Sequence, residues 1–101
     1  MRHYHRTSVG PADVIATADR FFAELGLRAA GAAGAAERDR AYSGPLGEMR
    51  LAVRMEGGHY TFVEVHTDQV GESRLDKNVK KFFNRLHTMA DPGHRMAGTH
   101  W

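Results

Sequence analysis

The strongest constraint on the fold is a pair of alternating segments on either side of Gly57 and Gly58. The apolar positions of residues 48–56 are Met49, Leu51, Val53 and Met55. Strict alternation with charged residues predicts a strand with one buried and one hydrated face, which is typical of antiparallel sheets. Two successive glycines predict a tight turn. Residues 59–67, rich in β-branched and aromatic side chains, are then the partner strand.

Two other segments have apolar residues at steps of three and four, which predicts amphipathic helices. The first runs from Pro11 to Leu25 and ends at Gly26, since Pro suits a first helical position and Gly a helix end. The second starts near Ser73, where Asp76 three residues later resembles a capping box. It ends before the Pro and Gly that follow Asp91. The two stripes are Val14, Ile15, Ala18, Phe21, Phe22 and Leu25, and then Leu75, Val79, Phe82, Phe83, Leu86 and Met89.

Two further strands are predicted at residues 2–9 and 37–43, and residues 28–36 are an Ala- and Gly-rich connector. The sequence therefore predicts the α+β class, as a two-layer sandwich in the order β-α-β-β-β-α. An antiparallel sheet of about four strands carries two helices on one face. We expect a single domain over residues 1–90 and an extended C-terminal tail over residues 91–101.

Length and charge exclude several classes of protein. A chain of 101 residues, 42% of them hydrophobic, has room for one domain and one core. It has no cysteine, so it has no disulfide framework and no thiolate metal site. A net charge of +2 argues against nucleic acid as a partner. The polar N-terminus has no signal peptide, and no segment is apolar for long enough to be transmembrane, so we expect a cytoplasmic location.

Two resemblances follow from these elements. The strand at 60–65, the turn Val70–Ser73 and the helix at 75–86 are similar to small uncharacterised bacterial α+β domains. In those domains a Thr-bearing strand leads through a Gly-acid-Ser turn into a terminal helix. The element order also resembles a shortened helix-grip domain, the ligand-binding fold of START-like and polyketide-cyclase-like proteins. That resemblance implies a small apolar ligand held between sheet and helices. Neither family transfers functional residues to this chain.

The face of the 59–67 strand that points away from the helices is the main candidate site. Thr61, Val63 and Val65 suit the covered side, which leaves Tyr60, Phe62 and His66 uncovered. Aromatic residues on an uncovered sheet face predict a partner-binding surface, and Met96 and Trp101 of the tail are predicted to join it. Glu64 shares this face with His66, as in general-base pairs, but we expect a solvated pair and no enzyme.

Two charged features complete the candidates. Lys77, Lys80, Lys81 and Arg85 form a basic stripe on the second helix, which predicts an anion-binding or membrane-facing surface. His3 and His5 are spaced to share one strand face and are metal-ligand candidates. No third ligand is at a supporting spacing, so we expect no metal and no cofactor.

These observations predict a small non-catalytic interaction module. It would be an accessory, peripheral subunit of a larger protein complex, with a membrane surface as one location. One alternative is a minimal helix-grip binder of a small apolar ligand. Another is a protein that binds anions or nucleic acid through the basic stripe.

Overall fold

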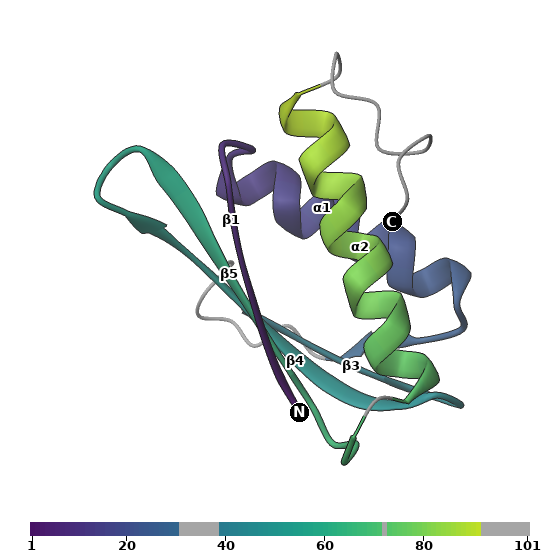
Figure 1. Ribbon diagram of the computed structural model, residues 1–101. Coiled ribbons are helices and arrows are strands. Elements are labelled where there is room, and N and C mark those ends of the chain that lie inside the picture. Colours follow the sequence, from purple (N-terminus) through teal and green to yellow (C-terminus); the bar gives the residue numbers. More distant parts are fainter. Residues whose placement is uncertain (31–38, 72, 92–101) are drawn as a thin grey trace.

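The computed structural model describes residues 1–30, 39–71 and 73–91 of the chain. Within this part, a five-stranded antiparallel sheet carries two helices on one face (Figure 1). The elements are β1 (Arg2–Thr7), α1 (Pro11–Glu24), β2 (Arg28–Ala30), β3 (Asp39–Gly44), β4 (Gly47–Glu56), β5 (Tyr60–Thr67) and α2 (Arg74–Ala90). The strand order is β1-β5-β4-β3-β2, so the first strand lies beside the last.

The predicted two-layer α+β architecture is confirmed, with one difference in the sheet. Residues 28–30, predicted as part of a connector, form the edge strand β2, in which Arg28 lies opposite Ser43 of β3. Small side chains do not prevent this, because an edge strand is held mainly by backbone hydrogen bonds. Residues 31–38 and the tail residues 92–101 lie outside the described part of the chain.

The start of α1, the cap of α2 and the turn between β4 and β5 lie where the sequence predicts them. Pro11 opens α1, and Ser73 caps α2 by accepting a hydrogen bond from the backbone N–H of Asp76 at 3.1 Å. Gly57 and Gly58 have φ angles of 66° and 74°, which favour glycine and close the β4–β5 turn. No helix in the described ranges is long and apolar enough to cross a membrane.

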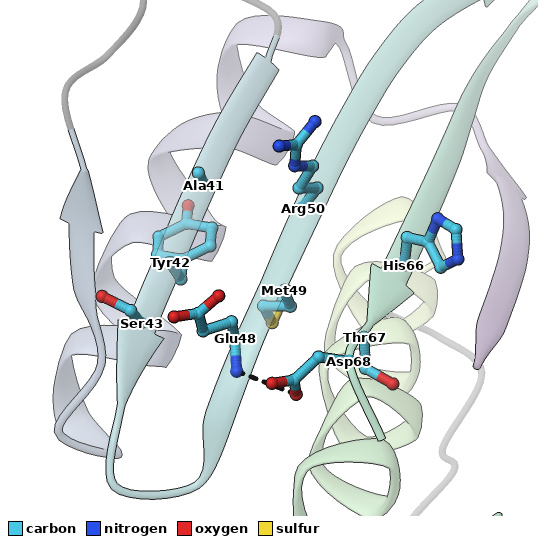
Figure 2. Close-up of a pocket in the computed structure, with 9 residues that line it drawn as sticks. All are labelled: Ala41, Tyr42, Ser43, Glu48, Met49, Arg50, His66, Thr67 and Asp68. Carbon is cyan, nitrogen blue, oxygen red and sulfur yellow. Dashed lines mark hydrogen bonds between the residues drawn. The ribbon is translucent and has the colours of Figure 1, made fainter. Parts of the chain in front are cut away.

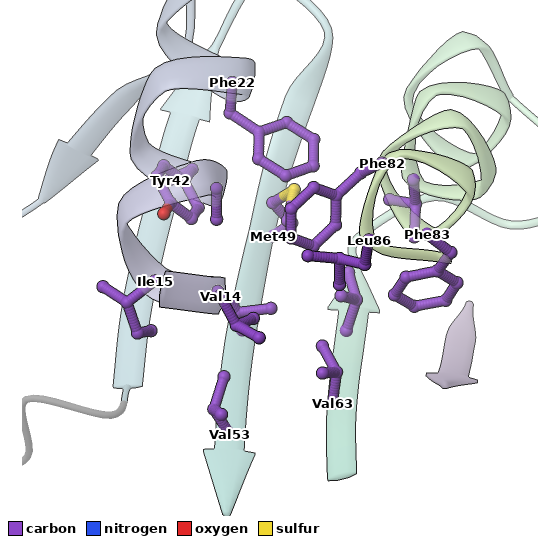
Figure 3. Packing of buried hydrophobic residues seen from close by; sticks show 14 of the residues in the cluster. Val14, Ile15, Phe22, Tyr42, Met49, Val53, Val63, Phe82, Phe83 and Leu86 are labelled. Carbon is purple, nitrogen blue, oxygen red and sulfur yellow. The ribbon is translucent and has the colours of Figure 1, made fainter. Parts of the chain in front are cut away.

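The core lies between the helices and the inner face of the sheet (Figure 3). The Phe22 ring of α1 lies 5.3 Å from Phe82 of α2 and 5.3 Å from Tyr42 of β3, measured between centroids. Leu51 is 1% exposed, as its alternation predicts, whereas Met55 is 42% exposed. The reason is that the β4–β5 hairpin extends past the helices (Figure 1). Packed side chains thus occupy the space where the helix-grip resemblance implies a ligand.

Candidate interaction site on the open face of the sheet

The candidate site is the sheet face opposite the helices, which we call the open face. No described helix covers it (Figure 1). Strand register brings residues of β1, β5 and β4 side by side: Arg6 and Arg54 both lie opposite Phe62. The main side chains of the open face are Arg2, Tyr4, Arg6, Glu48, Arg50, Arg54, Glu56, Tyr60, Phe62, Glu64 and His66.

Phe62 is the centre of the open face. The guanidinium carbons of Arg54 and Arg6 lie 4.5 Å and 5.0 Å from its ring centroid, and the Tyr4 ring lies 5.5 Å away. Guanidinium groups at such distances from a ring are attracted by its quadrupole. Phe62 lies on the face that the alternation predicts, but its neighbours leave it only 6% exposed. The accessible surface is therefore made by the arginines and tyrosines around it.

Carboxylates pair with three of the four arginines of this face, Arg2, Arg6 and Arg54. Arg6 Nε lies 2.6 Å from Glu56 Oε1. Arg2 Nε and Arg54 Nη1 lie 3.5 Å and 4.0 Å from the two oxygens of Glu64. The Glu64 carboxylate is thus engaged by arginines of two neighbouring strands. The predicted association of Glu64 with His66 is not formed, because Arg2 and Arg54, which lie diagonally to Glu64 on the neighbouring strands, take the carboxylate.

The exposed aromatic side chains of the open face are two tyrosines. Tyr4 is 51% exposed and Tyr60 is 54% exposed. Of the predicted partner-binding residues, Tyr60 and His66 are exposed here, while Met96 and Trp101 lie outside the described residues. Sequence reasoning missed Tyr4. Its alternation with Arg2 and Arg6 was a usable signal, but spacing within β1 does not reveal that β1 pairs with β5.

A depression of about 510 Å³ lies on the open face over β3, β4 and the end of β5 (Figure 2). Its lining residues are Ala41, Tyr42, Ser43, Glu48, Met49, Arg50, His66, Thr67 and Asp68. Asp68 Oδ1 accepts hydrogen bonds from the Glu48 backbone N–H at 3.1 Å and from Gln69 Nε2 at 2.6 Å. These bonds lower the pKa of Asp68. Arg50 has no ion pair within the described ranges and is available to an incoming group.

The two candidate metal ligands lie on the other side of the sheet, under α2. His3 is 9% exposed, and its Nε2 lies 2.7 Å from Asp76 Oδ1. The His5 ring stacks on Phe83 with centroids 4.9 Å apart. The two imidazoles share a strand face, as their spacing predicts, but each is directed at a different partner. Among the described residues, no three or more metal-ligating side chains gather.

The predicted basic stripe is on the helical side of the molecule. Lys77, Lys80, Lys81 and Arg85 are all exposed on α2. The Arg85 guanidinium lies 5.7 Å from the Phe21 ring of α1. The stripe and the open face therefore lie on opposite sides of the sheet, and the structure does not bring them together.

Comparisons with known proteins assign neither a family nor a function to this chain. No model of a protein family matches the chain, and a search of curated proteins finds no match.

Proposed function

We propose that the protein is a small non-catalytic interaction module that binds a partner protein through the open face of its sheet. In this proposal it is a peripheral subunit of a larger complex. One observation carries the proposal. Arg6 and Arg54 cover Phe62, and half-exposed Tyr4 and Tyr60 complete the cluster, on a face without a described helix.

The residue types of this cluster favour a protein partner. Tyrosine and arginine are enriched among the residues that contribute most to protein–protein binding, because they combine large contact area with polar groups. Glu56 and Glu64 already hold the arginines, so binding would order fewer free side chains. Arg50, beside the depression, favours a carboxylate on the partner.

The same face supports a binding role over a catalytic one. General-base catalysis needs a proton acceptor positioned at a reacting group. The Glu64 carboxylate is paired with Arg2 and Arg54, so it does not form the carboxylate–imidazole pair with His66 that a general base would use. The alternative of an apolar ligand between sheet and helices is less supported, because Leu51, Val63 and Phe82 fill that region at 0–1% exposure.

A double variant, Tyr4→Ala with Tyr60→Ala, tests the proposal and leaves buried Phe62 intact. The matched control is Arg20→Ala with Thr88→Ala, two exposed positions on the helices. Wild-type protein, double variant and control would each be used to capture proteins from an extract of the source cells. The captured partner would then be purified, and its Kd would be measured by calorimetry.

We expect one partner that binds the wild type and the control equally. Its Kd for the double variant should be weaker by about thirtyfold or more, since each interface tyrosine is worth at least about 1 kcal/mol. An unchanged Kd for the double variant would overturn the proposal. So would a wild type that captures nothing beyond what the double variant captures.

A further inference from the structure

The positive charge of the protein is concentrated on one helix. α2 holds five of the 14 Lys and Arg residues and one of the 12 Asp and Glu residues, so its formal charge is +4. The rest of the chain holds nine cations and eleven anions and has a charge of −2. The single acid of α2, Asp76, is buried. Among the acidic and basic side chains of α2, all the exposed ones are therefore basic, which the small net charge of +2 does not reveal.

Four cations of α2 differ in their ion pairs from four of the six arginines in the described strands. Each of Arg2, Arg6, Arg40 and Arg54 lies within 4.0 Å of a carboxylate. By contrast, Arg74, Lys77, Lys81 and Arg85 form no ion pair with any carboxylate of the described residues. Like charges at helical spacing repel one another. An external anionic surface would relieve this repulsion.

The geometry presents these cations as one surface. Arg74, Lys77, Lys81 and Arg85 follow at steps of three and four, opposite the buried stripe that contains Val79. The twelve residues from first to last are separated by eleven steps, which correspond to about 16 Å along the helix. The carboxylates of the open face lie on the far side of a molecule whose smallest extent is 22 Å. Screening over about 8 Å at physiological salt prevents them from cancelling the field of α2.

We propose that the outward face of α2 binds the surface of an anionic lipid membrane. Clusters of four or more Lys and Arg residues on a helix are typical of binding to acidic lipids. Val70, four residues before Arg74 in the sequence, is 99% exposed, and an exposed aliphatic side chain can enter the lipid interface. Nucleic acid is disfavoured because none of the exposed residues of α2 is aromatic and able to stack on a base.

This inference does not depend on the proposed protein partner. Contact through α2 leaves the open face, on the other side of the sheet, free to bind. The chain would then place a partner protein at a membrane surface, with charge providing the attachment and Val70 a small apolar contribution.

Vesicle flotation of the full chain tests the inference. The probes are vesicles of phosphatidylcholine alone and of phosphatidylcholine mixed with phosphatidylserine. We expect binding to the anionic vesicles only, and weaker binding as salt rises. Lys77→Gln with Lys81→Gln should lower the partition coefficient roughly tenfold to thirtyfold, because each basic residue contributes about 1 kcal/mol near the surface. Val70→Ser should lower it by a smaller factor.

The matched control removes the same charge elsewhere, as Arg20→Gln with Arg28→Gln. Both arginines are exposed and are without an ion pair in the described part of the chain. The control should bind anionic vesicles as the wild type does. An equal loss in the control would show a net-charge effect and overturn the inference. Binding without preference for anionic vesicles, or tighter binding to a duplex DNA at the same salt, would also overturn it.

Discussion

Nε2 of His3 lies 2.7 Å from Oδ1 of Asp76, and this buried contact joins the first strand to the last helix. The same carboxylate accepts hydrogen bonds from Thr67 Oγ1 at 2.9 Å and from Ser73 Oγ at 2.7 Å. Because an ionised carboxylate only accepts, His3 Nε2 is the donor. One side chain thus caps α2 and fastens it to β1 and β5.

Replacing this carboxylate by Asp76→Asn should lower the free energy of unfolding by about 3 kcal/mol. The amide has no charge, and its NH₂ group would face the donors of His3, Thr67 or Ser73. Urea unfolding at neutral pH measures the change. Asp13→Asn is the control, because Asp13 is exposed in the first turn of α1 and should cost only about 0.5 kcal/mol. Equal losses in both variants would contradict a special role for Asp76.

Asp76 should also account for part of the stability lost in acid. Burial acts to raise its pKa, but hydrogen bonds from His3, Ser73 and Thr67 outweigh burial and hold the pKa at about 2, below the usual 3.8. A lowered folded-state pKa gives stability that is present above 3.8 and is lost as pH falls toward about 2. The contribution is about 2 kcal/mol. Urea unfolding across this pH range should show that loss in the wild type, and Asp76→Asn should lack it.

His5 should oppose folding in mild acid. Burial, and then the nearby His87, lower the pKa of His5 below 6.5, and its Nε2 is buried without a hydrogen-bond partner among the described residues. The unfolded chain therefore takes up the proton first, and stability falls as pH drops below 6.5. His5→Phe keeps the stack on Phe83 and removes this proton uptake.

The test for His5 compares melting temperatures at about pH 7 and about pH 5. The melting temperature of His5→Phe should rise relative to that of the wild type as the pH falls. His59→Phe, at an exposed position beside the β4–β5 turn, should show the same difference from the wild type at both pH values. A pH-independent effect of His5→Phe would show that His5 does not titrate with folding.

Tyr42 should ionise only when the protein unfolds in alkali. Burial, and then the hydrogen bond from its Oη to Asp19 Oδ1 at 2.6 Å, raise its pKa far above the usual 10.0. Stability should therefore be lost as pH rises above 10.0, where the unfolded chain ionises. Absorbance titration should show one tyrosine that ionises only when the protein unfolds. This late ionisation should be absent in Tyr42→Phe and present in Tyr60→Phe. At neutral pH, Tyr42→Phe should cost about 1 kcal/mol.

Two aromatic residues of the open face should differ in their effect on stability. Phe62→Ala should cost about 3 kcal/mol, because the ring is 6% exposed and packs under two guanidinium groups. Tyr60→Ala should change stability by no more than about 0.5 kcal/mol, since that ring is 54% exposed. Urea unfolding of both variants checks this. A large loss in Tyr60→Ala would make it unsuitable for the binding experiment.

Local signals in the sequence predict local structure well. Residue spacing places Met49, Leu51 and Val53 on one buried face, because a strand alternates its side chains regardless of its neighbours. The strand β2 is not foreseen. Its three residues, Arg28 to Ala30, show no alternation of apolar and polar side chains, and only the edge of β3 makes them a strand.

In the candidate site, too, local spacing predicts which face a residue lies on but does not predict its neighbours from distant parts of the chain. Spacing assigns Phe62 to the open face, but its cover comes from Arg6, more than fifty residues earlier in the chain, and from Arg54 on the other side of the turn. The capping box of Ser73 and Asp76 is evident in the sequence, whereas the contact of Asp76 with His3 is not. No spacing rule connects residues so far apart.

By itself, the sequence determined both helices and four of the five strands, which side of each is apolar, and where the turns and helix caps lie. These properties follow from backbone geometry over a few residues. Only the tertiary structure decided that β1 lies beside β5, which brings Tyr4 and Arg6 to Phe62 and His3 to Asp76. It also decided that Arg74, Lys77, Lys81 and Arg85 of α2 face away from the paired charges of the open face. Strand order depends on burial and backbone pairing summed over the whole fold, and no local pattern contains that sum.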